Sequence, residues 1–253
     1  MADPALVLVI LAVASFTPPL VFLGVVRRTE RYGQEPLGRV LRTFAWGAIF
    51  AVIIAILLSV LLLTVYQEID RVYVFSGRFP NLETIVLALV IAPFAEEFAK
   101  GVGVYLAAPM IDEPEDGLVY GAAAGFGFAA TENLIYGLAA LLDPNGGLEV
   151  SLLVIGIRSV SSALLHASST GAFGYGIALS RIWSHRSAFP YYLLAVGMHA
   201  TYNFFASLGA LGETTFGESA ALIGLAGAIG LAVGAFILTR HWIRTSDEQR
   251  VAW

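Results

Sequence analysis

The sequence predicts an all-α polytopic membrane protein: a transmembrane helix bundle of about seven spans, with its N-terminus outside and its C-terminus cytoplasmic. Three observations lead to this fold class: the composition, the number of long apolar stretches and the placement of the arginines. Of the 253 residues, 58% are hydrophobic and 13% are charged, against about 45–50% and about 25% in soluble domains. This composition excludes a soluble enzyme and a disordered chain.

A membrane-spanning helix needs about 20 mainly apolar residues. Seven stretches meet this length: 5–26, 44–66, 83–108, 118–142, 150–180, 188–210 and 219–239. We expect Pro18 and Pro19 to kink the first span. The connections are short and contain turn-forming residues, as in Gly33–Pro36 and Asp143–Gly147. We therefore expect a single membrane domain over residues 1–253.

The orientation follows from the positive charges, of which the chain has 14. With the N-terminus outside, the outer segments contain Arg71 and Arg78. The inner segments contain ten arginines: Arg27, Arg28, Arg31, Arg39, Arg42, Arg181, Arg186, Arg240, Arg244 and Arg250. Cytoplasmic loops carry an excess of Lys and Arg, so ten against two predicts this orientation.

The two remaining cations, Lys100 and Arg158, lie inside predicted spans, together with several acids and histidines. Each ionisable group near the bilayer centre costs roughly 2.5–3.5 kcal/mol on insertion scales, so such groups usually have partners or a function. Four of them, each on a different span, lie close to the midpoint of that span: Glu97, Glu132, His166 and His199. We therefore predict a catalytic core over about 83–210 and a scaffold of 5–26, 44–66 and 219–239.

Helical spacing predicts which neighbouring side chains share a face. Glu96 and Lys100 are four residues apart and can form an ion pair. His199 and Asn203 have the same spacing, so the amide can orient the imidazole or bind a substrate carbonyl. Polar residues also recur at every fourth position in one stripe: Arg158, Ser162, His166 and Thr170. Gly121 and Gly125 form a small-xxx-small pair that lets two membrane helices approach closely.

Two carboxylates and two imidazoles at one depth suit the activation of water. In one form of this chemistry, a metal such as Zn²⁺ is held by His and Glu ligands and lowers the pKa of a bound water, while a remaining Glu takes the proton. In the other form no metal binds, a buried Glu is the general base, and His or Asn stabilises the oxyanion.

Several other chemistries are excluded by their missing motifs. The chain has no cysteine, which rules out disulfides and thiolate metal sites. It contains no His-Glu-x-x-His zinc motif and no Gly-x-x-x-x-Gly-Lys-Ser/Thr phosphate loop. It also lacks the Gly-x-Ser-Gly of a rhomboid-type serine nucleophile and the Tyr-Asp and Gly-x-Gly-Asp pair of an aspartyl dyad.

Four segments resemble the motifs of PrsW-like intramembrane proteases. Glu96-Glu97-Phe-Ala-Lys100 resembles their Glu-Glu-x-x-Lys motif, and Phe128-Ala-Ala-Thr-Glu132 resembles their Phe-x-x-x-Glu motif. The segments that begin at His166 and His199 resemble their two histidine motifs. A more distant similarity is to the CAAX-prenyl endopeptidase and bacteriocin-immunity superfamily, from which this chain departs at Lys100 and Glu132.

The resemblance implies an intramembrane endopeptidase in a prokaryotic plasma membrane, of the metallo- or glutamic type. It implies site-1-type cleavage of a single-pass membrane protein in the lipid bilayer, such as an anti-sigma factor; no nucleic-acid partner is expected. We expect six catalytic residues: Glu96, Glu97, Glu132, His166, His199 and Asn203. One of Glu96 and Glu97 is the base and the other pairs with Lys100; Phe128 and Arg158 are supporting residues. A Zn²⁺ ion, if used, would be held by His166, His199 and Glu132.

Two other classes of function use the same residues differently. A transporter or channel could use the buried charges as an ion or proton relay. A non-enzymatic scaffold could bind partner helices through its glycine faces. Proton-coupled flux without proteolysis would favour the transporter, whereas tolerance of Glu and His substitutions would favour the scaffold.

Overall fold

The computed structural model describes residues 3–79, 81–211, 217 and 219–250, and every regular element among them is helical. The all-α prediction is therefore confirmed. The elements, in chain order, are α1 (Pro4–Arg27), α2 (Leu37–Trp46), η1 (Gly47–Ala51), α3 (Val52–Tyr73), α4 (Leu82–Val86), η2 (Leu87–Ile91), α5 (Ala92–Ala107), η3 (Ala108–Met110), α6 (Pro114–Leu142), α7 (Leu148–Val160), α8 (Ser162–Ile182), α9 (Phe189–Leu211) and α11 (Ser219–Arg250).

Among the described residues, five stretches have the length and hydropathy of a membrane span: Pro4–Arg27, Leu37–Tyr73, Pro114–Leu142, Leu148–Ile182 and Ser219–Glu248. Two of the seven predicted spans are helical but fall outside this set. The stretch 83–108 is divided into α4, η2 and α5, and α9 has His199, Asn203 and several tyrosines among its apolar residues. The orientation of the bundle, including the inner position of Arg250, whose side chain lies outside the described residues, stays a prediction.

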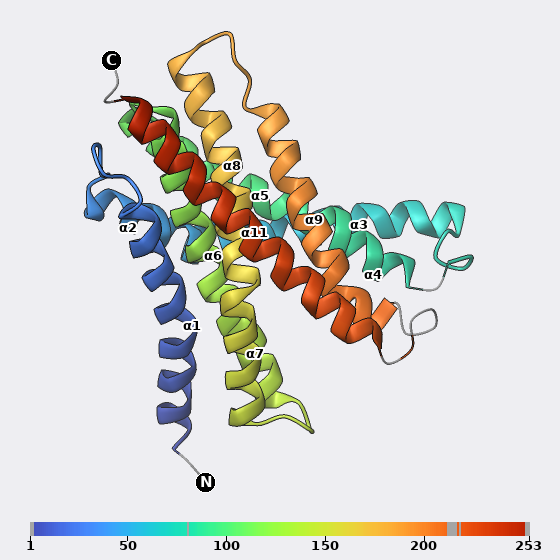
Figure 1. Cartoon of the computed structure of the whole chain (residues 1–253). Coiled ribbons are helices and arrows are strands. Elements are labelled where there is room, and N and C mark those ends of the chain that lie inside the picture. Colours follow the sequence, from blue (N-terminus) through green and yellow to red (C-terminus); the bar gives the residue numbers. More distant parts are fainter. Residues whose placement is uncertain (1–2, 80, 212–216, 218, 251–253) are drawn as a thin grey trace.

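The centre of the bundle is the contact between α6 and α8, which is the most extensive between any two described elements. Gly121 and Gly125 make it possible, because a Cβ at either position would overlap a backbone carbonyl of α8, that of Thr170 or of His166. The predicted close approach at these two glycines is thus confirmed. The packing fixes the height of His166 relative to Glu132 on α6. In Figure 1, α3 runs crosswise to α1, α6 and α7.

Three irregularities interrupt the helices near the centre. The predicted span 150–180 is broken at Ser161, which separates α7 from α8. The other two are the π-helical segments η1 and η2, and segments of this kind are frequent at functional sites. Pro93 follows η2 and lacks the N–H that an upstream carbonyl would need. In each π segment one carbonyl accepts a side-chain hydrogen bond from another helix: Ala48 from Thr131 Oγ1 (2.7 Å) and Ala88 from Asn203 Nδ2 (2.8 Å).

The connection between α1 and α2 is held by buried acids. Asp247 of α11 accepts hydrogen bonds from the backbone N–H groups of Arg31 (2.7 Å) and Tyr32 (3.2 Å). Glu30 is 2% exposed and accepts a hydrogen bond from the Glu35 N–H (3.0 Å), while its other oxygen, Oε1, has no hydrogen-bond partner among the described residues. Burial raises the pKa of the Glu30 carboxyl to about 8, helped by nearby acids.

This shift predicts a pH-dependent stability. Because the folded pKa of Glu30 (about 8) exceeds its ordinary value of 4.5, the folded chain holds one more proton than the unfolded chain between these values. Stability should therefore fall as the pH rises from about 5 to about 8. We expect a higher unfolding temperature in detergent at pH 5.5 than at pH 8.5, and a smaller difference for Glu30→Gln. An equal difference in the variant would show that Glu30 is not the group responsible.

Candidate active site

Four helices bring the predicted residues together in the interior. Glu97 and Lys100 on α5 are fully buried, and His166 on α8 and His199 on α9 are 1% and 2% exposed. The two imidazole rings meet edge to face, with their centroids 4.7 Å apart. The structure thus contains a buried group of Glu and His side chains, whereas their common depth in the membrane stays a prediction.

Glu97 is the centre of the hydrogen-bond network. Its Oε1 accepts from Lys100 Nζ (2.6 Å), from Ser169 Oγ (3.0 Å) and from His199 Nδ1 (3.0 Å), and its Oε2 accepts from Thr170 Oγ1 (2.8 Å). Three of these donors come from other helices, so Glu97 ties α5 to α8 and α9. Since both of its oxygens are occupied by donors, Glu97 has little capacity left to take a proton from water.

Glu96 is in the opposite situation. Its Oε2 is buried and has no hydrogen-bond partner among the described residues. Lys100 Nζ is 4.0 Å from this oxygen, against 2.6 Å from Glu97. Lys100 therefore pairs more closely with Glu97 than with Glu96, the partner that helical spacing suggested. A buried carboxylate oxygen without a hydrogen bond is costly to maintain, so Glu96 has an open hydrogen-bonding position that water, a metal or a substrate could fill.

The contacts of the two histidines indicate where their protons lie. His199 Nδ1 donates to the Glu97 carboxylate, which leaves the Nε2 lone pair 3.7 Å from Glu96 Oε2. His166 Nδ1 lies 2.8 Å from Lys100 Nζ, and a lysine ammonium is only a donor, so this nitrogen accepts. His166 Nε2 then carries the proton and donates to Glu132 Oε2 at 2.9 Å. Lys100, His166 and Glu132 thus form a continuous hydrogen-bonded chain.

Glu132 has its own cation. Arg158 Nη2 is 2.7 Å from Glu132 Oε2, its Nε donates to Asn133 Oδ1 at 3.1 Å, and its guanidinium lies over the Tyr136 ring at 3.8 Å. Arg158, predicted as a supporting residue, is therefore the counter-ion of Glu132. Three carboxyl groups, those of Glu96, Glu97 and Glu132, thus lie near two cations, Lys100 and Arg158.

The other two predicted residues hold elements in place. Asn203 does not bond to His199: its amide donates to the Ala88 carbonyl of η2, and its side chain lines the cavity beside Glu96. Phe128 lies under Lys100, with Nζ 4.8 Å from its ring centroid. Sequence reasoning missed Ser169, which donates to Glu97, and Tyr202, which lines the cavity and hydrogen-bonds to Ser161. The run Ser168–Thr170 beside His166 was the available signal for Ser169.

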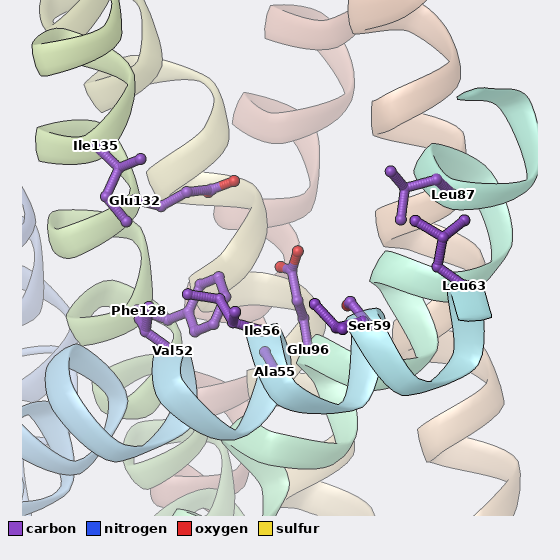
Figure 2. Close-up of a pocket in the computed structure, with 11 residues that line it drawn as sticks. Val52, Ala55, Ile56, Ser59, Leu63, Leu87, Glu96, Phe128, Glu132 and Ile135 are labelled. Carbon is purple, nitrogen blue, oxygen red and sulfur yellow. The ribbon is translucent and has the colours of Figure 1, made fainter. Parts of the chain in front are cut away.

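A cavity of about 450 Å³ opens onto this site. Its lining combines apolar residues with a set of polar and charged ones, which are Glu96, Glu132, Arg158, His166 and Asn203. On the other side of the two carboxylates lies a second, mainly apolar pocket of about 350 Å³, shown in Figure 2. Glu96, Glu132 and Leu87 line both spaces. The two carboxylates therefore stand where a polar space and an apolar space meet.

The donor set fits a metal ion. Glu96, His166 and His199 each offer a ligand atom, and these three atoms lie within 4.8 Å of one another. One carboxylate and two imidazoles are a set that catalytic zinc takes. Two further features match such a site. Glu96 Oε2 has no hydrogen bond among the described residues, and the Nε2 lone pair of His199 is free while its Nδ1 donates to Glu97. The structure groups Glu96, rather than Glu132, with the two histidines. Glu132 instead accepts a hydrogen bond from His166 Nε2.

A bundle of apolar helices that encloses carboxylates, imidazoles and an adjoining cavity defines a class: integral membrane proteins with a hydrolase-type site in their interior. The family follows from comparison with known proteins. The model of the PrsW family intramembrane metalloproteases matches residues 35–238, and the chain belongs to this family. The matched residues include the whole buried group, from Glu96 to His199.

Curated relatives agree with this assignment. A protein named protease PrsW from Geobacillus kaustophilus is 31% identical over 129 residues, covering 50% of this chain and 51% of that protein. Protease PrsW from Clostridioides difficile is 26% identical over 195 residues, covering 74% and 75%. The one from Halalkalibacterium halodurans is 28% identical over 167 residues, covering 65% of each chain. The chain thus spans about half to three quarters of these relatives. No solved structure matches it.

Proposed function

We propose that this chain is an intramembrane endopeptidase that hydrolyses a peptide bond of a single-pass membrane protein, in a site-1-type step such as the release of an anti-sigma factor. Membership of the PrsW family supports the reaction class. The observation that carries the proposal is the unpaired oxygen of Glu96, 3.7 Å from the Nε2 of His199, at the junction of a polar cavity and an apolar pocket. Water can enter from the first and an apolar segment from the second.

The roles of the residues follow from their contacts. Glu97, saturated with hydrogen bonds, orients His199 and Lys100 and is a positioning residue. Glu96 is the reactive carboxylate. Without a metal, Glu96 takes a proton from water, the hydroxyl attacks the peptide carbonyl, and the proton passes to the leaving nitrogen. The second N–H of the Asn203 amide, which is not needed for Ala88, can donate to the oxyanion.

With a metal, Glu96, His166 and His199 would hold it, and it would supply Lewis acidity and lower the pKa of water. In this form Glu132, at the wall of the cavity, is the carboxylate that remains to accept the proton of water, while Arg158 compensates its charge. Glu96 takes part in the reaction in both forms, as the base without a metal and as a ligand with one.

The proposed activity is tested with purified protein in liposomes that also contain a single-pass reporter with an anti-sigma-factor membrane segment. We expect cleavage within or beside the membrane segment, located by mass spectrometry of the products. The control is His199→Ala, which should leave the reporter intact. Proton flux in the same liposomes without any cleavage would contradict the proposal and favour a transporter.

A metal-removal experiment separates the two forms of the mechanism. We expect purified protein to contain stoichiometric metal by elemental analysis, and we expect a chelator to stop reporter cleavage until Zn²⁺ is added. Glu96→Gln should lower the metal content, because it replaces a charged ligand with a neutral amide. Glu149→Gln, an exposed substitution at the start of α7, should not. Full activity in metal-free protein would contradict the metal form and leave the glutamate form.

A further inference from the structure

An apolar groove runs along one face of α3. The α3 residues that line it follow helical spacing, at intervals of three and four positions: Val52, Ala55, Ile56, Ser59, Val60 and Leu63. Ser59 is the one polar side chain among these six. The regular spacing means that a single continuous stripe of the helix forms this wall, whereas Leu57 and Leu61 of the same helix point elsewhere.

The opposite wall belongs to the helices of the site. Leu87 of η2, Glu96 of α5, and Phe128, Glu132 and Ile135 of α6 complete the lining. Figure 2 shows the Glu96 and Glu132 carboxylates directed into the groove, with Ser59 of α3 beside Glu96. The groove is therefore mainly apolar, and the reactive carboxylate of Glu96 forms part of its wall opposite α3.

The groove opens outward between helices rather than into the core. Ile56 and Val60 on its α3 wall are 53% and 59% exposed. Only 22% of the apolar part of the span Leu37–Tyr73, to which α3 belongs, is buried inside the bundle. In a membrane, such a surface faces lipid. A segment that moves sideways within the bilayer can thus reach Glu96 without crossing the polar cavity.

We propose that this groove receives the transmembrane segment of the substrate, and that the stripe of α3 around Ser59 determines which side chain fits beside the cleaved bond. The inference rests on the proposed peptidase function and names the substrate contact. The chemistry of the lining selects the occupant: an apolar side chain covers the α3 stripe, while its own peptide carbonyl reaches Glu96. A volume of about 350 Å³ holds a large apolar side chain with its backbone, which makes Ser59 a specificity-determining position.

Crosslinking tests contact directly, because the chain has no cysteine. Ser59→Cys is prepared in a Glu96→Gln background, so that the reporter stays intact, and the reporter has a single cysteine beside its cleavage site. We expect a bifunctional maleimide to join the two. Leu57→Cys, on the same helix but off the stripe and 64% exposed, should give no such product. Equal crosslinking at both positions, or none at Ser59, would overturn the proposal. A fluorophore attached to Ser59→Cys provides a second measurement. Its quenching by brominated lipid while the reporter is bound would show that lipid occupies the groove, which would also overturn the proposal.

Side-chain size provides the second test. In the active protein, Ser59→Leu fills the groove beside Glu96, so we expect loss of cleavage for a reporter with Phe or Leu beside the cleaved bond and retained cleavage for one with Ala. Leu57→Ala should cut both reporters as the unsubstituted chain does. A parallel loss for both reporters would overturn the specificity role. Crosslinking without any cleavage by the unsubstituted protein would refute the peptidase function alone, whereas cleavage without crosslinking would refute the groove alone.

Discussion

Glu96→Gln should abolish reporter cleavage while the protein still folds. The amide keeps the shape of the side chain but can neither take a proton nor ligate a metal as a carboxylate does. General acid–base groups contribute about 10²–10⁴-fold to rate, so we expect a loss of at least about 100-fold. In metal-free protein the unfolding temperature should stay the same or rise, since the substitution removes a buried carboxylate oxygen that has no hydrogen bond.

The matched control is Glu149→Gln, which makes the same chemical change at an exposed position. It should leave both cleavage and the unfolding temperature unchanged. Initial rates over a range of reporter densities in the bilayer separate lost turnover from lost binding. Residual cleavage of Glu96→Gln close to that of the control would show that Glu97 or Glu132 is the reactive carboxylate instead.

Lys100→Met should unfold the centre of the bundle more than any other single substitution at the site. Lys100 is fully buried and donates to both Glu97 and His166, at 2.6 Å and 2.8 Å. Its removal leaves the Glu97 carboxylate without a cation in the interior, and breaking one partner of a buried ion pair costs about 3–5 kcal/mol. We expect a corresponding fall in the free energy of unfolding, measured by denaturant titration in detergent.

The double variant Lys100→Met/Glu97→Gln tests the cause of that loss. Because the second substitution removes the uncompensated charge, the double variant should recover a part of the stability that Lys100→Met loses. Exposed Arg71, which pairs with Glu68 on the surface of α3, provides the control: Arg71→Met should change stability by less than about 1 kcal/mol. An additive double variant would show that Glu97 and Lys100 are not energetically coupled.

Glu96 and Glu97 show how much helical spacing can predict about side-chain contacts. Positions i and i+4 and positions i and i+3 are both neighbours on a helix surface, so the sequence could not decide whether Lys100 joins Glu96 or Glu97. The partner of Lys100 depends on α8 and α9. These helices bring Ser169, Thr170 and His199 to Glu97, whereas Glu96 Oε2 is left without a hydrogen bond. Asn203 shows the same limit: its spacing from His199 suggested a contact, but the π segment η2 offers it a freed carbonyl.

The sequence by itself determined the helical membrane class and the four helices that contribute the polar groups. Apolar length and the cost of a charge in the bilayer act locally, so they can be read along the chain. Only the tertiary structure decided which carboxylate stays free, which three residues could hold a metal and how an apolar groove reaches Glu96. These features depend on helix rotation, on the breaks at Ser161 and at η2 and on the crosswise course of α3 in Figure 1, because side chains far apart in sequence meet only once the helices are packed.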